Sequence, residues 1–200
     1  EHARIIRPGY AIEYDYVNPV QLHPTFETRV TAGLWLAGQI NGTSGYEEAA
    51  AQGLWAALNI AARLEKRPPF LPLRSEAYMA VLADELVTKG TQEPFRMFTS
   101  RAEYRLLLRE DNADARLTPM GRERGLVNDE QWELFCERQS TLKDLLHKLE
   151  NTRLTPTAAT AAAFKELSEP CPNQAVTLAV LGRRPQLELR RLAAFLPELA

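Results

Sequence analysis

This sequence of 200 residues has no long hydrophobic run, nearly balanced charge and only two cysteines. No apolar run approaches the roughly 20 residues that a membrane-spanning helix requires. The opening residues, Glu-His-Ala-Arg, lead into no apolar segment of the kind that a secretory signal carries. We therefore expect a cytoplasmic protein without a membrane partner.

Charge and cysteine content narrow the function classes further. The chain has 24 Lys and Arg against 26 Asp and Glu, so its overall charge gives no reason to expect nucleic acid. Any basic surface must come from local clustering. Cys136 and Cys171 lie far apart and form no metal-ligand spacing, which predicts free thiols in a reducing compartment and no metal site.

The most structured stretch runs from Gly33 to Arg67. A short apolar run, residues 34–37, lies between two glycines and predicts a buried strand. A glycine-rich turn follows at residues 38–45. Ser44 and Glu47 have the spacing of a capping box, which predicts the start of a long helix.

This strand, turn and helix start could bind an electron-rich ligand. Free backbone N–H groups and the positive end of the helix dipole would point out of the turn. The same pattern is equally consistent with an ordinary strand-to-helix turn of an α/β domain, because a single glycine-rich turn is weak evidence. Both interpretations stay open on the residues alone.

Proline marks the expected domain boundary. Residues 68–74 are rich in proline, and strand patterns nearly vanish after them. We predict that residues 1–67 form the edge of an α/β domain, that residues 68–74 are a linker, and that residues 75–200 form an all-helical domain. The expected fold class is therefore α+β, mostly α.

Tyrosines alternate with polar residues near the N-terminus. Tyr10, Ile12, Tyr14 and Tyr16 have the period of a strand and would share one face. Core packing is the interpretation that this pattern favours. The alternative is an aromatic wall beside a planar ligand.

Arginines recur at every fourth position in a second unusual stretch. Ser100 and Glu103 predict a helix start, and Arg101, Arg105 and Arg109 would then share one helix face. Such a row suits phosphate groups, which guanidinium binds bidentately. A solvated face, paired with neighbouring carboxylates, is the interpretation that the sequence alone favours.

Three motifs in the right order resemble the MnmG family, also called GidA. They are RPGYAIEYDY at residues 7–16, AGQINGTSGYEEAAAQG at residues 37–53 and MFTSRAEYRLLLREDNADARLT at residues 97–118. The resemblance implies an enzyme that uses FAD, NADH and methylenetetrahydrofolate. It also implies that a GTPase of the MnmE type assists in adding an aminomethyl or carboxymethylaminomethyl group at C5 of the wobble uridine of tRNA. A homodimer is implied as well.

The resemblance also assigns residues. It implies that residues 1–67 end an FAD-binding domain, and that the helix N-terminus after the turn faces the pyrimidine edge of the flavin ring. It further implies that the helical domain contacts tRNA or the partner. The residues implied for FAD contact are Gln39, Gly38, Asn41, Gly42 and Thr43. The residues implied for contact with tRNA phosphates are Arg101, Arg105, Arg109 and Arg96.

Two parts of the family pattern are absent from this chain. The dinucleotide fingerprint G-x-G-x-x-G and the cysteine segment of the family's covalent chemistry do not occur. We therefore expect a C-terminal fragment that holds no catalytic residue, is inactive alone and does not necessarily bind FAD. Two alternatives remain: a folate- and FAD-dependent tRNA methyltransferase similar to TrmFO, and a non-catalytic helical module that binds RNA or a protein partner.

Overall fold

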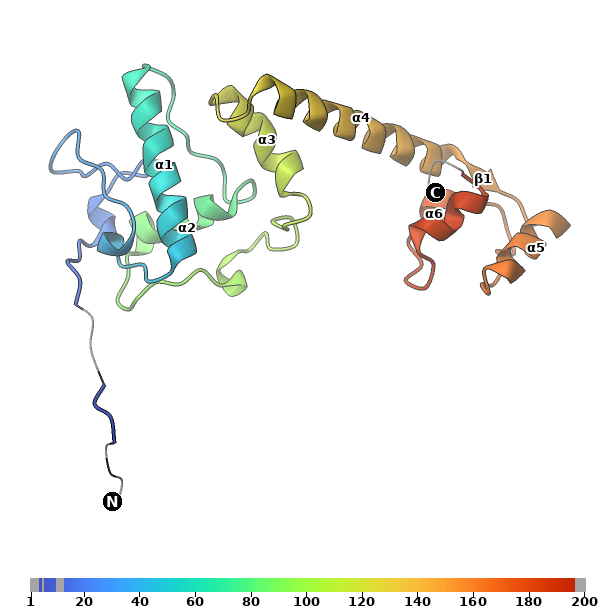
Figure 1. Ribbon diagram of the computed structural model, residues 1–200, viewed down its shortest axis with the longest axis horizontal. Helices are drawn as coiled ribbons and strands as arrows, with labels where there is room; N and C mark the ends of the chain where they lie inside the picture. The colour runs from blue at the N-terminus through green and yellow to red at the C-terminus, as the bar shows by residue number, and fades with distance from the viewer. Residues whose placement is uncertain (1–3, 5, 10–12, 197–200) are drawn as a thin grey trace. The chain divides into compact units, whose positions relative to one another are not determined.

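The computed structural model describes residue 4, residues 6–9 and residues 13–196. Its residues cluster into two compact units, residues 1–126 and residues 127–200 (Figure 1). The fold is mostly helical with one small sheet, which confirms the expected α+β class. Within the described ranges no helix combines the length and the apolar character needed to cross a membrane.

Unit 1 is built on two helices, α1 (Tyr46–Leu64) and α2 (Tyr78–Lys89), with a third, α3 (Ala113–Glu123), near its end. Three short 3-10 helices complete it, at Pro19–Gln21, Gln39–Asn41 and Thr99–Arg101. The rest of the described part of this unit is loops and turns. Its backbone groups must therefore find partners outside regular secondary structure.

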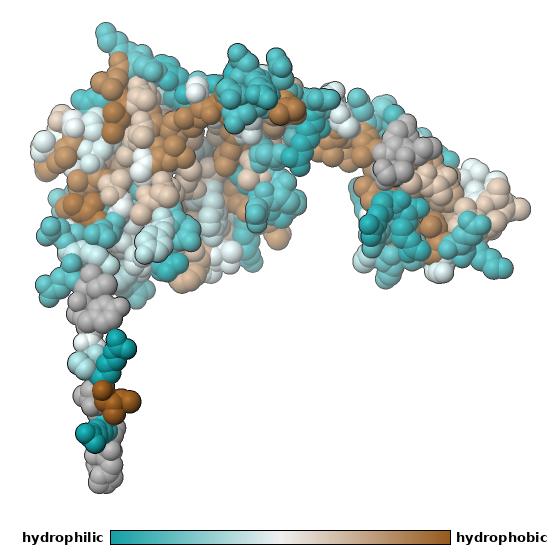
Figure 2. All heavy atoms as spheres, viewed as in Figure 1, coloured by the Kyte–Doolittle hydropathy of each residue, from teal (hydrophilic) through white to brown (hydrophobic). Residues whose placement is uncertain are grey.

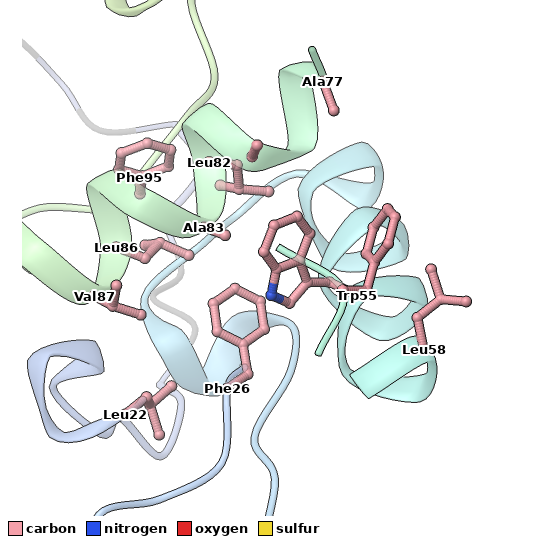
Figure 3. Close-up of a cluster of buried hydrophobic side chains, with 12 residues drawn as sticks. Leu22, Phe26, Trp55, Leu58, Ala77, Leu82, Ala83, Leu86, Val87 and Phe95 are labelled. Carbon is pink, nitrogen blue, oxygen red and sulfur yellow. The ribbon is translucent and has the colours of Figure 1, made fainter. Parts of the chain in front are cut away.

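The core of unit 1 lies between α1, α2 and the loops before them. Trp55 of α1 packs against Phe26, with ring centroids 6.2 Å apart, and against Phe70 at 5.5 Å. Leu22 and Leu86 close the cluster and are fully buried. Figure 3 shows that Phe26 and Trp55 point toward each other below α2.

The strand expected at residues 34–37 does not form. Residues 26–36 make only isolated bridges, such as Glu27 with Trp35, and two hydrogen bonds join residues 26 and 28 to residues 36 and 34. The reason is local geometry. Phe26 has φ of 70° and Gly33 has φ of 86°, and neither value fits an extended strand. The apolar run at residues 34–37 is therefore a loop, and residues 10–12 of the tyrosine pattern lie outside the described residues.

The two units do not divide at the proline-rich connector. Phe70 lies in the core of unit 1, and both its N–H and its carbonyl oxygen are bound by the side chain of Asn59, at 2.9 and 3.1 Å. Arg67 and Arg124 tie the connector to the end of α3 through carbonyl oxygens. Proline therefore shapes a packed segment here, and the division falls at residues 126 and 127.

Unit 2 begins with the long helix α4 (Asp129–Asn151), whose start the sequence predicts at Asn128 or Asp129. Asn128 and Gln131 form a complete capping box, each side chain accepting a hydrogen bond from the other residue's backbone N–H. The core gathers Leu149, Phe164 and Leu178. The remaining elements are β1 (Arg153–Leu154), α5 (Ala158–Glu166), β2 (Val176–Thr177), α6 (Leu178–Leu181) and a 3-10 helix at Leu189–Ala194.

Two details of unit 2 differ from expectation. The antiparallel pair of β1 and β2 interrupts a domain that was expected to be all-helical, pairing Arg153 with Thr177. Cys136, which its neighbours Trp132 and Phe135 predict to be a packed thiol, is exposed. Within unit 2 the apolar face of α4 is buried mainly toward its C-terminal end, around Leu149. Figure 2 shows hydrophobic residues among hydrophilic ones on the visible surface.

The packing of Phe26 leads to the first prediction. Replacing Phe26 by alanine should lower the free energy of unfolding by about 3–5 kcal/mol, since it leaves a cavity against Trp55. Phe98→Ala is the matched control, because Phe98 is 59 % exposed. Urea unfolding of the chain would measure both variants. Equal, small losses would contradict the proposed core.

Candidate functional site

The turn at residues 38–43 depends on two glycines. Gly38 has φ of 89° and ψ of −146°, a conformation open essentially to glycine alone, and it begins the short 3-10 helix Gln39–Asn41. Gly42 ends that helix in the left-handed region, with φ of 81°. A Cβ atom on Gly42 would also overlap the hydroxyl of Thr91 and approach the ring of Tyr16 to 3.0 Å.

A single side chain of α1 holds this turn in place. The Oε1 atom of Gln52 accepts hydrogen bonds from the N–H of Gly38 at 3.1 Å and from the amide of Asn41 at 2.9 Å. Its Nε2 donates to Thr43 Oγ1 at 2.9 Å, and that hydroxyl donates onward to the carbonyl of Gly38. Gln52, Asn41 and Thr43 are all buried. Their side chains fix the shape of the turn and do not face solvent.

Gln39 is the residue of the turn that faces outward. It is exposed and borders a cavity of about 230 Å³. Tyr14 and Tyr16, each about half exposed, form another side of this cavity. The hydroxyl of Tyr16 bonds to Thr91, donating to its carbonyl oxygen at 3.0 Å. The full lining is Tyr14, Tyr16, Gln39, Gly42, Thr43, Ser44, Thr91, Gln92, Glu93 and Pro94.

The start of α1 differs from the predicted capping box. Gly45 is the N-cap residue, and no side chain caps it, so the pairing of Ser44 with Glu47 does not form. Glu48 lies in the first turn instead and is only 4 % exposed. Its carboxylate lies over Gly45, in the space that a Cβ atom would fill. The N-terminus of α1 therefore already carries a carboxylate of its own chain.

Three bonds stabilise this buried carboxylate in its charged form. Burial by itself raises the pKa of Glu48. The N–H of Met97 at 2.8 Å, the backbone N–H of Glu48 and the guanidinium of Arg96 at 3.2 Å outweigh it, and the pKa is lowered overall. Glu48 is thus an ionised group that joins the start of α1 to residues 96 and 97.

The predicted arginine row is wrong. Only Thr99–Arg101 is helical there, as a short 3-10 helix, and residues 103–107 form turns. Phe98 is its N-cap and makes no side-chain cap bond, so Ser100 and Glu103 do not form a capping box. Without an α-helix, Arg101, Arg105 and Arg109 share no face.

Each predicted tRNA-contacting arginine has its own surroundings. The Arg101 guanidinium stacks on the ring of Phe95, 4.5 Å from its centroid, and lies 3.8 Å from Glu85. Arg109 pairs with Asp111 at 2.9 Å, and Arg96 pairs with Glu48. Arg105 is exposed, and among the described residues its side chain makes no hydrogen bond or ion pair.

Other arginines hold this irregular segment. Arg74 binds both carboxylate oxygens of Glu103 at 2.7 Å, which lowers the pKa of Glu103 to about 2. Arg116 donates to the carbonyl oxygens of Glu76 and Arg109 at 2.6 and 3.0 Å. These side chains take the place of missing backbone partners.

Sequence reasoning missed the two residues that organise the site, Gln52 and Glu48. Both lie on one face of α1, four positions apart, and Asn59 continues that face. Polar residues at this spacing, on the same face as Trp55, were the available signal. No role was predicted for either residue, and two of the small residues of α1, Gly53 and Ala57, are exposed.

The role of Gln52 can be tested directly. Gln52→Met keeps the side-chain volume but removes the acceptor for the N–H of Gly38 and for the amide of Asn41. Each buried donor left without a partner costs roughly 1–3 kcal/mol. The variant should lose about 2–4 kcal/mol of stability in urea unfolding. Gln39→Met, at an exposed position of the same turn, should change stability by less than ~0.5 kcal/mol. Similar stabilities for the two variants would refute the network.

Two protein families match parts of this chain. Residues 1–68 match the family "Glucose inhibited division protein A", and residues 129–200 match the "tRNA modifying enzyme MnmG/GidA C-terminal helical domain". The site turn and α1 lie in the first match, and α4 to α6 lie in the second.

Two solved structures of GidA from Aquifex aeolicus are similar to the chain. The form II crystal structure is 40 % identical with a TM-score of 0.80, covering 94 % of this chain and 29 % of that one. The form I structure is 35 % identical with a TM-score of 0.68, covering 92 % of this chain and 33 % of that one. The chain thus spans about a third of the length of these relatives. It belongs to the MnmG/GidA family of tRNA-modifying enzymes.

Proposed function

We propose that this chain supplies one wall of an FAD site and a tRNA-facing segment. The whole enzyme would modify C5 of the wobble uridine with an aminomethyl or carboxymethylaminomethyl group. It would use NADH and methylenetetrahydrofolate and act with a GTPase of the MnmE type. The observation that carries the proposal is the turn at residues 38–43, fixed from inside by Gln52 and open on its other side to a cavity.

The residues around the cavity fit part of a flavin. Tyr14 and Tyr16 offer exposed aromatic surface to a planar ring, and the Gln39 amide can both donate and accept hydrogen bonds. Gly42 borders the cavity and lets the backbone approach a ligand closely, whereas Gly38 is buried and shapes the turn. FAD, when bound, would supply the redox chemistry, and the chain's own residues would bind and orient it.

The division of roles within the turn is sharper than the sequence suggested. Gln39 remains the side chain proposed to contact FAD. Asn41 and Thr43 would contribute only backbone atoms, because Gln52 occupies their side chains. The N-terminus of α1 is neutralised by Glu48, so the proposal no longer depends on a free helix dipole at the flavin.

The arginines also differ in what they offer to RNA. Arg105 is exposed and has no competing ion pair among the described residues, so it is the strongest phosphate ligand of the four. Arg96 and Arg109 are about half exposed but each pairs with a carboxylate. Arg101 is held over Phe95. Contacts of this kind would position tRNA without reading its sequence.

The remaining parts of the proposal concern the whole protein. We place the reactive groups outside these 200 residues, so this chain alone would be inactive. A cytoplasmic homodimer is the proposed working form.

FAD binding tests the role of Gln39. In the full-length protein, Gln39→Ala should weaken FAD about tenfold, the loss expected for one or two hydrogen bonds. Gln21→Ala, at an exposed glutamine away from the cavity, is the control and should bind as the parent does. Fluorescence titration of the apoprotein would measure both. An unchanged affinity for Gln39→Ala would remove this side chain from the site.

Salt dependence tests the role of Arg105. Arg105→Gln should weaken tRNA binding and reduce the slope of log K against log salt by about 0.7–0.9, the share of one phosphate contact. Arg29→Gln removes an exposed arginine elsewhere in unit 1 and serves as the control. Binding curves at several salt concentrations would give both slopes. A slope that Arg105→Gln leaves unaltered would rule out a phosphate contact at this residue.

A further inference from the structure

Two segments that lie far apart in the sequence meet at the start of α1. The N–H of Phe95 donates to the carbonyl of Gly42 at 2.7 Å, and the N–H of Ser44 donates to the carbonyl of Phe95 at 3.4 Å. Thr43 and Phe95 form a parallel bridge. Residues 42–44, at the end of the turn, thus pair with Phe95, the residue directly before the segment at residues 96–109.

Glu48 continues this junction with a buried charge. One of its carboxylate oxygens, Oε1, accepts both the N–H of Met97 at 2.8 Å and the Nε of Arg96 at 3.2 Å. The other, Oε2, is buried over Gly45 without a hydrogen-bond partner. The carboxylate therefore contacts the last residue before α1 and the first two residues of the segment at 96–109.

This geometry leaves the carboxylate little freedom. Glu48 is 4 % exposed, so a movement away from Met97 would leave a buried charge without this hydrogen bond, which costs free energy. A ligand that shifts or stiffens the turn before Gly45 would act on Glu48 directly. Glu48 would transmit that change to the backbone of residue 97 and to the guanidinium of Arg96, which is 51 % exposed.

We infer that Glu48 is a positioning residue that couples ligand binding at the 38–43 turn to the placement of residues 96–109. The inference rests on the proposed function, in which the first segment holds FAD and the second meets tRNA. Binding of FAD would then tighten the binding of tRNA. Because such coupling is reciprocal, tRNA would tighten FAD by the same factor.

The test is a comparison of tRNA affinity with and without saturating FAD in the full-length protein. The ratio of the two dissociation constants measures coupling and is not changed by a general loss of affinity. In the parent protein we expect a ratio of about fivefold or more, the lower end of typical coupling. Glu47→Gln is the matched control, because Glu47 is the exposed neighbour of Glu48 in the same helical turn, and it should keep the parent ratio.

Glu48→Gln should bring the ratio close to one while each ligand still binds. Gly45→Ala is a second route to the same result, since its Cβ atom would expel the carboxylate without removing it.

The outcomes separate the inference from the proposed function. Coupling that survives in Glu48→Gln, or a parent protein that binds FAD and tRNA without coupling, would overturn the inference alone. A parent protein that binds no FAD would overturn the proposed function, and the inference with it.

Discussion

Unit 1 depends on three buried polar side chains that lie along one face of α1. Glu48, Gln52 and Asn59 are each at most 4 % exposed, and each binds a backbone N–H of a different loop. Their partners are Met97, Gly38 and Phe70, at 2.8, 3.1 and 2.9 Å. A buried backbone donor without a partner costs roughly 1–3 kcal/mol, so these bonds decide where the loops can lie.

These bonds hold loops that no sheet supports in the described part of unit 1. Among the described residues of unit 1 the strands are reduced to isolated bridges, and most of the chain between the helices is irregular. Arg74 and Arg116 serve the same purpose at the motif of residues 97–118, where they bind carboxylate and carbonyl oxygens. The family motifs at residues 37–53 and 97–118 are therefore held by side chains, and their shapes follow from α1 and α2.

The sequence predicted the features that depend on local chemistry. The glycine turn and the long helix after it are both present. Each is a property of a few neighbouring residues. The mostly helical class and the family followed from such features and from the order of the motifs.

Two of the differences involve contacts between distant residues. The helix expected at residues 100–109 is replaced by turns, and Arg74, 29 positions away from Glu103, binds the carboxylate of Glu103 there. The proline-rich connector is packed because Asn59 binds Phe70. Neither partner can be recognised from spacing, and an alternation of apolar residues says nothing about whether a strand finds a neighbour.

The same contacts give the family motifs a physical meaning. Gln52 shapes the turn proposed to meet FAD, and Glu48 joins that turn to the segment proposed to meet tRNA. A single helix thus supports both surfaces. The central claim is that its polar face, and not regular secondary structure, keeps them in place.

Hydrogen exchange of three backbone amides tests this claim most directly. The amides of Gly38, Phe70 and Met97 lie in loops, and each donates to a side chain of α1. In the intact chain we predict that all three exchange as slowly as the central amides of α1, because they open only when the helix does. Fast exchange of these amides while α1 stays protected would show that its polar face does not hold the loops, and would contradict the account.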